Sequence, residues 1–142
     1  MRRTARRLRL GAHYATITGA CVRLAARRAD PSETQRVRRR MDRIDELDTE
    51  AQRRLLDDVQ IEIVALSQSA RLTREQMKLQ AELSPYLRLV AHETENLRRQ
   101  GAHLAAVIDA VEAGDPDAAG ARTELMAAET IDALIRLQAA NG

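Results

Sequence analysis

The sequence predicts an all-α fold, an antiparallel bundle of six to seven helices, and three observations favour it. Apolar residues recur three and four positions apart along most of the 142 residues. Capping residues, prolines and a glycine divide this pattern into segments of helix length. The sequence has no alternating run of β-branched residues and no Asn-Gly hairpin. A single domain of this length buries about two-thirds of its unfolded surface, so it needs no disulfide or structural metal.

The first expected helix covers residues 14–28 and is followed by a clear start signal. Its apolar stripe consists of Ile17, Cys21, Leu24 and Ala25. Asp30 is a suitable N-cap, Pro31 suits the first helical position, and Glu33 completes a capping box. A second helix therefore follows and extends to about Leu47.

A third helix follows the link 48–50 and reaches about Ser69. Its apolar face consists of Leu55, Val59, Ile63 and Leu66. Thr73 is the expected cap of a fourth helix. Pro85 has no amide hydrogen and clashes with the preceding turn, so we expect a kink or a new helix there.

The last two expected helices meet at a glycine. The apolar face of the first of them consists of Leu97, Leu104, Val107, Ile108 and Val111. Gly114 stands where a left-handed C-terminal cap belongs. Pro116 then starts the last helix, which extends to about Ala139.

Basic residues are concentrated at the start of the chain, including an expected basic N-terminal arm over residues 1–13. Residues 1–40 contain 12 Arg and two acidic residues, whereas the remainder contains 11 basic and 19 acidic residues. Contact of this arm with DNA phosphates is one interpretation. The interpretation we favour is that the basic helices dock on the acidic ones.

Composition excludes several classes of protein. Cys21 is the only cysteine, so no intrachain disulfide forms, which favours the reducing cytoplasm. No apolar run reaches the roughly 18 to 20 residues that cross a bilayer. Tyr14 and Tyr86 are the only aromatic residues, too few for a surface on which nucleic-acid bases stack.

Three segments, in this order, carry a resemblance to a known family. They are residues 23–31 (RLAARRADP), 57–72 (DDVQIEIVALSQSARL) and 107–119 (VIDAVEAGDPDAA). Together they resemble the FCD domain, the C-terminal ligand-binding bundle of FadR-type regulators in the GntR family. We therefore expect an FCD-like effector-binding domain over residues 14–140.

The resemblance implies a small-molecule effector, a homodimer and DNA contact only through a winged helix-turn-helix. In the family that module precedes the bundle, and it does not precede the match here. The sequence therefore indicates either a free-standing effector domain or part of a longer regulator. It does not choose between the two.

The resemblance also implies a divalent metal held by one Asp and three His. The matching positions here are Asp58, Glu62, Leu104 and Met126. Because leucine and methionine do not replace imidazole for such an ion, we expect no metal and no other cofactor. Asp58 and Glu62 are the residual candidates, with His103 joining them if the alignment is shifted by one residue.

The expected ligand pocket follows from the same positions. It consists of Asp58, Glu62, Leu104, Val107, Met126 and Tyr14. The two carboxylates lie beside an apolar stripe, so they receive either a cationic or hydroxylated ligand or nearby arginines and water. For Asp58 we favour arginines and water, and for Glu62 both alternatives stay open. Tyr14 replaces a family arginine that lies near the effector carboxylate, so a fixed cation for an acidic ligand is missing.

These observations predict an effector-binding and dimerisation domain of a transcriptional regulator with a degenerate metal site. Two alternatives are a pseudo-sensor that only dimerises and a repurposed enzyme that uses Asp58 or Glu62 for acid-base chemistry. We expect no catalytic residue. His13, His92 and His103 have no serine or cysteine partner in a nucleophilic motif.

Overall fold

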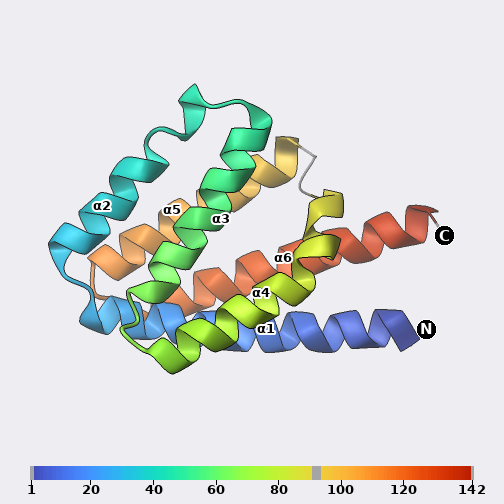
Figure 1. Cartoon of the computed structure of the whole chain (residues 1–142), viewed down its shortest axis with the longest axis horizontal. Coiled ribbons are helices and arrows are strands. Elements are labelled where there is room, and N and C mark those ends of the chain that lie inside the picture. The colour runs from blue at the N-terminus through green and yellow to red at the C-terminus, as the bar shows by residue number, and fades with distance from the viewer. Residues whose placement is uncertain (1, 91–93, 142) are drawn as a thin grey trace.

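The computed structural model describes residues 2–90 and 94–141, and it confirms the all-α prediction. In these residues the chain forms six α-helices and one short 3-10 helix, without a strand (Figure 1). The elements are α1 (Arg2–Arg28), α2 (Pro31–Met41), η1 (Ile44–Glu46), α3 (Thr49–Ala65), α4 (Ala70–Val90), α5 (Thr94–Glu112) and α6 (Pro116–Asn141). His92 lies outside the described residues.

The predicted start of α2 is confirmed, but its predicted end is wrong. The Asp30 amide donates a hydrogen bond to the Glu33 carboxylate at 3.0 Å, as in a capping box. α2 ends at Met41 rather than Leu47, because the chain turns there and continues as η1. The last predicted boundary is confirmed at Gly114, which has a φ of 67° and follows α5.

The connection between α3 and α4 differs from the prediction. α3 stops four residues before Ser69, and Gln68 adopts a φ of 57°, the left-handed conformation that commonly ends a helix. The Ser69 hydroxyl then accepts a hydrogen bond from the Leu72 amide at 3.2 Å. Ser69, and not Thr73, therefore caps α4.

α4 continues through Pro85 to Val90 rather than ending at the proline. Figure 1 shows that the last turns of α4 leave the direction of its first part. A bend is what a proline inside a helix produces, because its ring displaces the preceding carbonyl and one hydrogen bond is lost.

α1 and α6 lie antiparallel along most of their length and place both chain termini at one end of the bundle (Figure 1). α1 is one helix from Arg2, so residues 2–13 of the expected arm continue the first helix of the bundle without a break. Gly11 permits close packing there, since a Cβ at that position would collide with Ile131 of α6.

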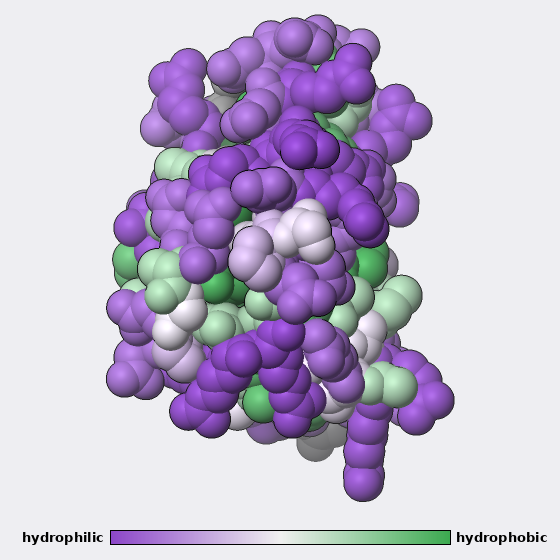
Figure 2. All heavy atoms as spheres, turned by 90° about the vertical axis from the view of Figure 1, so that its left-hand side faces the viewer, coloured by the Kyte–Doolittle hydropathy of each residue, from purple (hydrophilic) through white to green (hydrophobic). Residues whose placement is uncertain are grey.

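Several arginines of the first 40 residues pair with acids of later helices. Arg38 of α2 binds Asp109 at 2.6 Å and Glu112 at 2.7 Å, both on α5. Arg23 of α1 binds Glu124 of α6 at 2.9 Å. The face of the molecule in Figure 2 is largely hydrophilic. For Arg23 and Arg38 the basic helices do dock on acidic ones, whereas the interpretation of residues 1–13 stays a prediction.

Apolar stripes of five helices meet in one main cluster. Its members include Val22, Val37, Leu56, Val59, Ile63, Leu104, Val107, Ile108 and Met126. Cys21 is also fully buried, and burial raises the pKa of its thiol to about 11. Among the described residues, no helix combines the length and the apolarity that a membrane crossing requires.

Replacing a leucine of this cluster should destabilise the fold much more than replacing an exposed one. Leu56 is 0% exposed and Leu125 is 48% exposed. Leu56→Ala should lower the free energy of unfolding by about 2 to 5 kcal/mol, because it leaves a cavity. Leu125→Ala should change it by less than about 0.5 kcal/mol. Urea unfolding of both variants measures the difference, and equal losses would contradict the assigned core.

Candidate functional site

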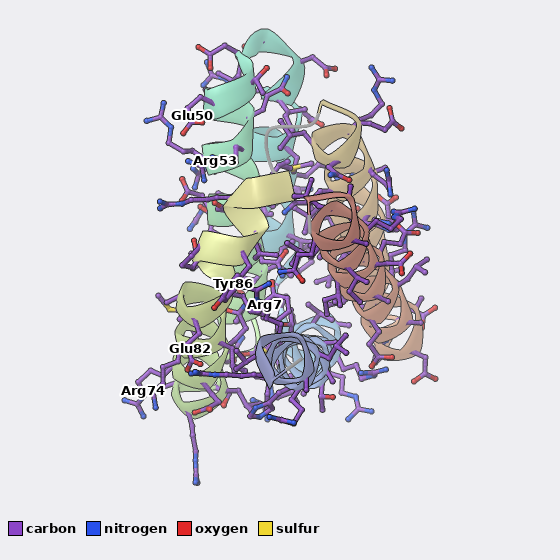
Figure 3. The ribbon with its side chains drawn as sticks, turned by 90° about the vertical axis from the view of Figure 1, so that its right-hand side faces the viewer. Arg7, Glu50, Arg53, Arg74, Glu82 and Tyr86 are labelled. Carbon is purple, nitrogen blue, oxygen red and sulfur yellow. The ribbon has the colours of Figure 1, made fainter. Side chains whose placement is uncertain are left out.

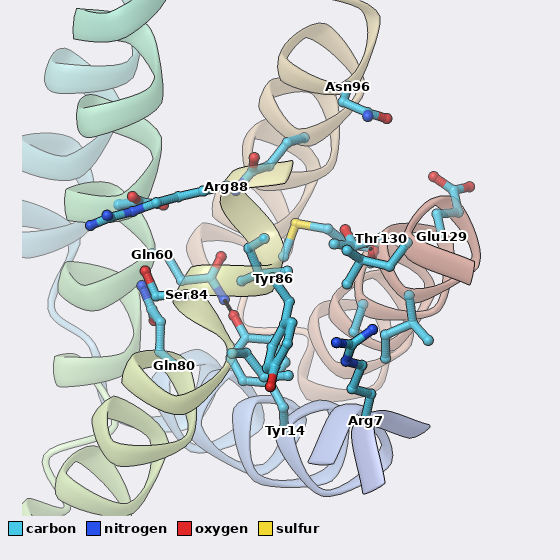
Figure 4. A pocket seen from close by; sticks show the side chains of 18 of the residues that line it. Arg7, Tyr14, Gln60, Gln80, Ser84, Tyr86, Arg88, Asn96, Glu129 and Thr130 are labelled. Atoms are coloured by element: carbon cyan, nitrogen blue, oxygen red, sulfur yellow. Dashed lines mark hydrogen bonds between the residues drawn. The ribbon is translucent and has the colours of Figure 1, made fainter. Parts of the chain in front are cut away.

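A cavity of about 120 Å³ lies among α1, α3, α4, α5 and α6 (Figure 4). Both aromatic residues of the chain, Tyr14 of α1 and Tyr86 of α4, line it although 72 positions separate them. Arg7 near the start of α1 and Gln138 near the end of α6 also line it.

Neutral polar groups form the inner wall. The Gln60 amide donates to the Tyr14 hydroxyl at 3.0 Å, the contact drawn as a dashed line in Figure 4. Burial, together with the negative charge of Asp57, raises the pKa of Tyr14 above its ordinary value. Gln80 lines the cavity and accepts a hydrogen bond at 2.8 Å from Gln76, which is fully buried behind the wall. Tyr14 is thus a neutral phenol among amides, suited to hydrogen bonding with a ligand.

An ion pair borders the cavity on the α3 side. Arg53 binds Asp57 at 3.2 Å and Glu50 at 2.6 Å, all within one helix. Burial raises the pKa of the Asp57 carboxyl, and the nearby guanidiniums of Arg53 and Arg88 oppose this shift. The Asp57 carboxylate is therefore already occupied by protein cations.

His103 is held on the opposite side by partners on both ring nitrogens. Its Nε2 lies 2.6 Å from the Glu129 carboxylate, and Arg122 donates to its Nδ1 at 2.8 Å. Because a guanidinium only donates, Nδ1 must accept and the proton lies on Nε2, which donates to Glu129. This hydrogen bond lowers the pKa of Glu129.

Arg7 supplies a further cation that the sequence analysis missed. Its guanidinium carbon lies 4.3 Å from the centroid of the Tyr86 ring, and the two meet between α1 and α4 (Figure 3). Its Nε is buried and has no hydrogen-bond partner within the part of the chain described here. Arg7 and Tyr14 are seven residues apart on one helix, which places them on the same face.

The predicted pocket residues separate into three locations. Tyr14 and Met126 line the cavity, and so does His103. Leu104 and Val107 lie behind it, only 2% and 1% exposed. They surround a gap too small for a water molecule, which Gln60 and Met126 also line.

Asp58 and Glu62 lie outside the cavity, at the contact between α3 and α2. Arg40 of α2 binds Asp58 at 3.6 Å and also pairs with Glu62. Each residue of a helix turns it by about 100°, so positions two residues from Gln60 point to the other side of α3. Between the two alternatives for Glu62, the structure places it with an arginine.

The residues at the expected metal position do not fit a divalent ion. Gln60, rather than Glu62, meets Leu104 and Met126, and Leu56 lies one turn earlier on the same face of α3. Hydrocarbon, thioether and amide groups replace the imidazoles and carboxylate that such an ion requires. No cluster of three or more His, Cys, Asp or Glu side chains suited to a metal occurs within residues 2–90 and 94–141.

The fold defines the class as an all-α helical-bundle domain with a cavity among five of its helices. The family model described as the FCD domain matches residues 10–128, which include parts of all six helices. The chain therefore belongs to the FCD domain family, whose members occur in GntR-family regulators. No curated protein matches the chain.

Removing the Tyr14 hydroxyl should destabilise the protein, because the buried Gln60 amide then loses its acceptor. Tyr14→Phe should lower the free energy of unfolding by about 1 to 3 kcal/mol. Tyr86→Phe, which keeps the ring that packs on Arg7, is the matched control and should cost less than about 0.5 kcal/mol. Thermal unfolding compares them, and an unaffected Tyr14→Phe variant would argue against the inner wall described above.

The contact between Glu129 and His103 should stabilise the fold in a pH-dependent way. The pKa of Glu129 is lower in the folded state, so its stabilisation is present above the ordinary value of 4.5 and is lost as the pH falls through the folded pKa. The stability difference between the wild type and Glu129→Gln should therefore shrink below about pH 4.5. Urea unfolding at several pH values measures it. Asp132→Asn, an exposed change on α6, should show no such trend.

Proposed function

We propose that this chain is the effector-binding domain of a GntR-type transcriptional regulator and that a small molecule binds in the cavity among the five helices. The observation that carries the proposal is this cavity, which gathers both tyrosines of the chain and a set of polar groups. In a domain that only dimerises, side chains would fill this cavity. Membership of the FCD family supports a regulatory domain.

The wall of the cavity has the composition of a ligand site. Leu83, Leu87 and Leu134 supply apolar surface, whereas Tyr14 and Gln80 supply neutral hydrogen-bonding groups. Pockets for small molecules combine a largely apolar lining with a few placed polar groups. The volume of about 120 Å³ is below the roughly 300 to 1,000 Å³ of pockets for drug-sized ligands, so the effector is small.

Binding would act by shifting the population of helix arrangements. Leu8, Ile131 and Ile135 line both the cavity and a shallow groove on the surface between α1 and α6. A ligand that changes their packing therefore changes an outer surface as well. We propose a homodimer, and a winged-helix domain in the same or a partner protein, as the elements that respond to this change.

We propose binding without catalysis in this cavity. His103 has a protein partner on each ring nitrogen, so neither is free to take a proton from a substrate. Asp58 and Glu62, the residues of the enzyme alternative, pair with Arg40 outside the cavity. We propose the cytoplasm as the compartment, because Cys21 is a free and buried thiol.

A thermal-shift screen with a library of small polar metabolites tests the proposal. Compounds that bind should raise the melting temperature, with about 2.7 kcal/mol of stabilisation at a hundredfold excess over Kd. Ala127→Leu, which fills the cavity from α6, should abolish this shift. Ala121→Leu makes the same change at an exposed position of α6 and should retain it. An equal response of both variants, or none in the wild type, would argue against a ligand in this cavity.

A further inference from the structure

We infer that an exposed basic face formed by α1 and the first half of α4 binds the phosphate backbone of duplex DNA without reading the base sequence. This inference goes beyond the proposed function, in which DNA contact belongs to a winged-helix domain, and it does not depend on the cavity. It rests on the placement of the cations, the scarcity of carboxylates beside them and the kinds of side chain that the face lacks.

Two stripes of cations form this face, which we call the α1–α4 basic face. Its members are six exposed cations, Arg6, Arg9 and Arg27 on α1 and Arg71, Arg74 and Lys78 on α4. At about 100° per residue, the three positions of each helix fall within about 60° of one another around its axis. Each helix therefore presents its cations as one stripe.

Hydrogen bonds hold the end of α1 beside the start of α4. The Arg28 guanidinium donates to the Ser67 carbonyl at 3.0 Å, and the Gln68 amide donates to the Arg28 carbonyl at 2.9 Å. Both partners lie in the link immediately before α4, which begins at Ala70. The α1 stripe therefore ends next to the point where the α4 stripe begins.

The two stripes face the same way, away from the bundle. Arg7 near the start of α1 packs on Tyr86 in the second half of α4, so the two helices run antiparallel side by side. On each helix the stripe lies roughly a quarter turn or more from that contact, on the side exposed to solvent. Figure 3 shows α1 end-on with the first half of α4 beside it, and Arg74 pointing outward. The stripes therefore form one continuous surface.

Carboxylates are scarce on the α1–α4 basic face. Residues 1–29 contain no Asp or Glu, so α1 contributes cations alone. α4 places Glu75 and Glu82 beside its stripe, and within the described part of the chain neither forms an ion pair with a member of the face. On another side of α1, by contrast, Arg23 binds Glu124 at 2.9 Å. Six cations against two carboxylates leave this face a net charge of +4.

The dimensions and composition of the face fit a DNA duplex. Arg6 and Arg27 are 21 positions apart, about 32 Å along α1 and close to the roughly 34 Å of one turn of B-DNA. Both aromatic residues of the chain line the cavity, so the face has no ring on which the bases of a single strand stack. Contacts from arginine and lysine to phosphates release counterions and carry no sequence information.

An anionic membrane fits the α1–α4 basic face less well. Helices that bind at a membrane surface combine basic residues with large apolar ones that enter the lipid. The positions of both stripes hold cations, and Leu8, the exposed leucine of α1, lies in the groove toward α6 instead. We therefore assign the face to DNA.

Fluorescence anisotropy of labelled duplexes of about 24 base pairs, two turns of DNA, tests the inference with the full chain. Two duplexes of unrelated sequence should bind equally, with a Kd of about 1 μM or below at about 50 mM NaCl. If all six cations contact phosphates, the binding constant should fall about a thousandfold between about 50 and 200 mM NaCl.

Neutralising the α1 stripe should weaken this binding. In the triple variant Arg6→Gln, Arg9→Gln and Arg27→Gln, the salt dependence should become about half as steep, and the affinity at low salt should fall at least about tenfold. The corresponding triple change to Lys keeps the charges and should retain most of the binding. This pair of variants separates loss of phosphate contacts from loss of fold.

A second triple variant controls for net charge. Arg36→Gln, Arg39→Gln and Arg54→Gln remove the same charge from exposed arginines of α2 and α3, and this variant should bind nearly as tightly as the wild type. If both triple Gln variants lose the same affinity, binding follows net charge and the assigned face is wrong.

The remaining outcomes also decide the inference. Absence of binding at low salt contradicts it, and a preference for one of the two duplexes contradicts readout of the backbone alone. If the chain cosediments with phosphatidylserine vesicles but does not bind the duplexes, the face is a membrane site and the assignment to DNA fails. None of these results bears on the cavity, whose ligand the thermal-shift screen tests separately.

Discussion

The close antiparallel packing of α1 against α6 is the constraint on which the cavity depends. Gly11 brings the two backbones together where any side chain would collide with Ile131. Farther along, the guanidinium of Arg23 on α1 crosses directly over Gly120 of α6. With α1 held at this distance, Arg7 and Tyr14 face the space between α4 and α6. Gly11, which does not itself line the cavity, thus helps to position the helix that supplies part of the cavity wall.

The sequence predicted the number and order of the helices because their start and stop signals are local. The Asp30 and Glu33 pair and Gly114 act within a few residues of the chain, so their effect can be recognised without knowing the fold. The ends of α2 at Met41 and of α3 at Ala65 were predicted too late, because the final turns of a helix depend on tertiary packing as well as on local signals. The N-terminal half of α1 was missed for a different reason. Its many arginines conceal an apolar face whose partner, Ile131, lies on the last helix.

The site was harder to predict because it depends on how each helix is rotated about its axis. Tyr14 and Met126 line the cavity, whereas Asp58 and Glu62 lie outside it, since two positions along α3 reverse the direction of a side chain. Gln60 lies between them and is the residue that reaches Tyr14. Arg7 carried a weak signal, its separation of two helical turns from Tyr14. Only the packing of α4 shows that its guanidinium meets Tyr86.

The arrangement of the apolar core indicates which helix a ligand would move. Within the described residues, the main cluster draws on α1, α2, α3, α5 and α6, and α4 contributes none of its members. α4 nevertheless supplies much of the cavity wall, from Gln80 to Arg88, and it contains the bend at Pro85. A helix outside the main cluster shifts at a lower free-energy cost than a helix within it. A small molecule that packs on the leucines of α4 in this cavity would therefore displace α4 more readily than a helix of the main cluster.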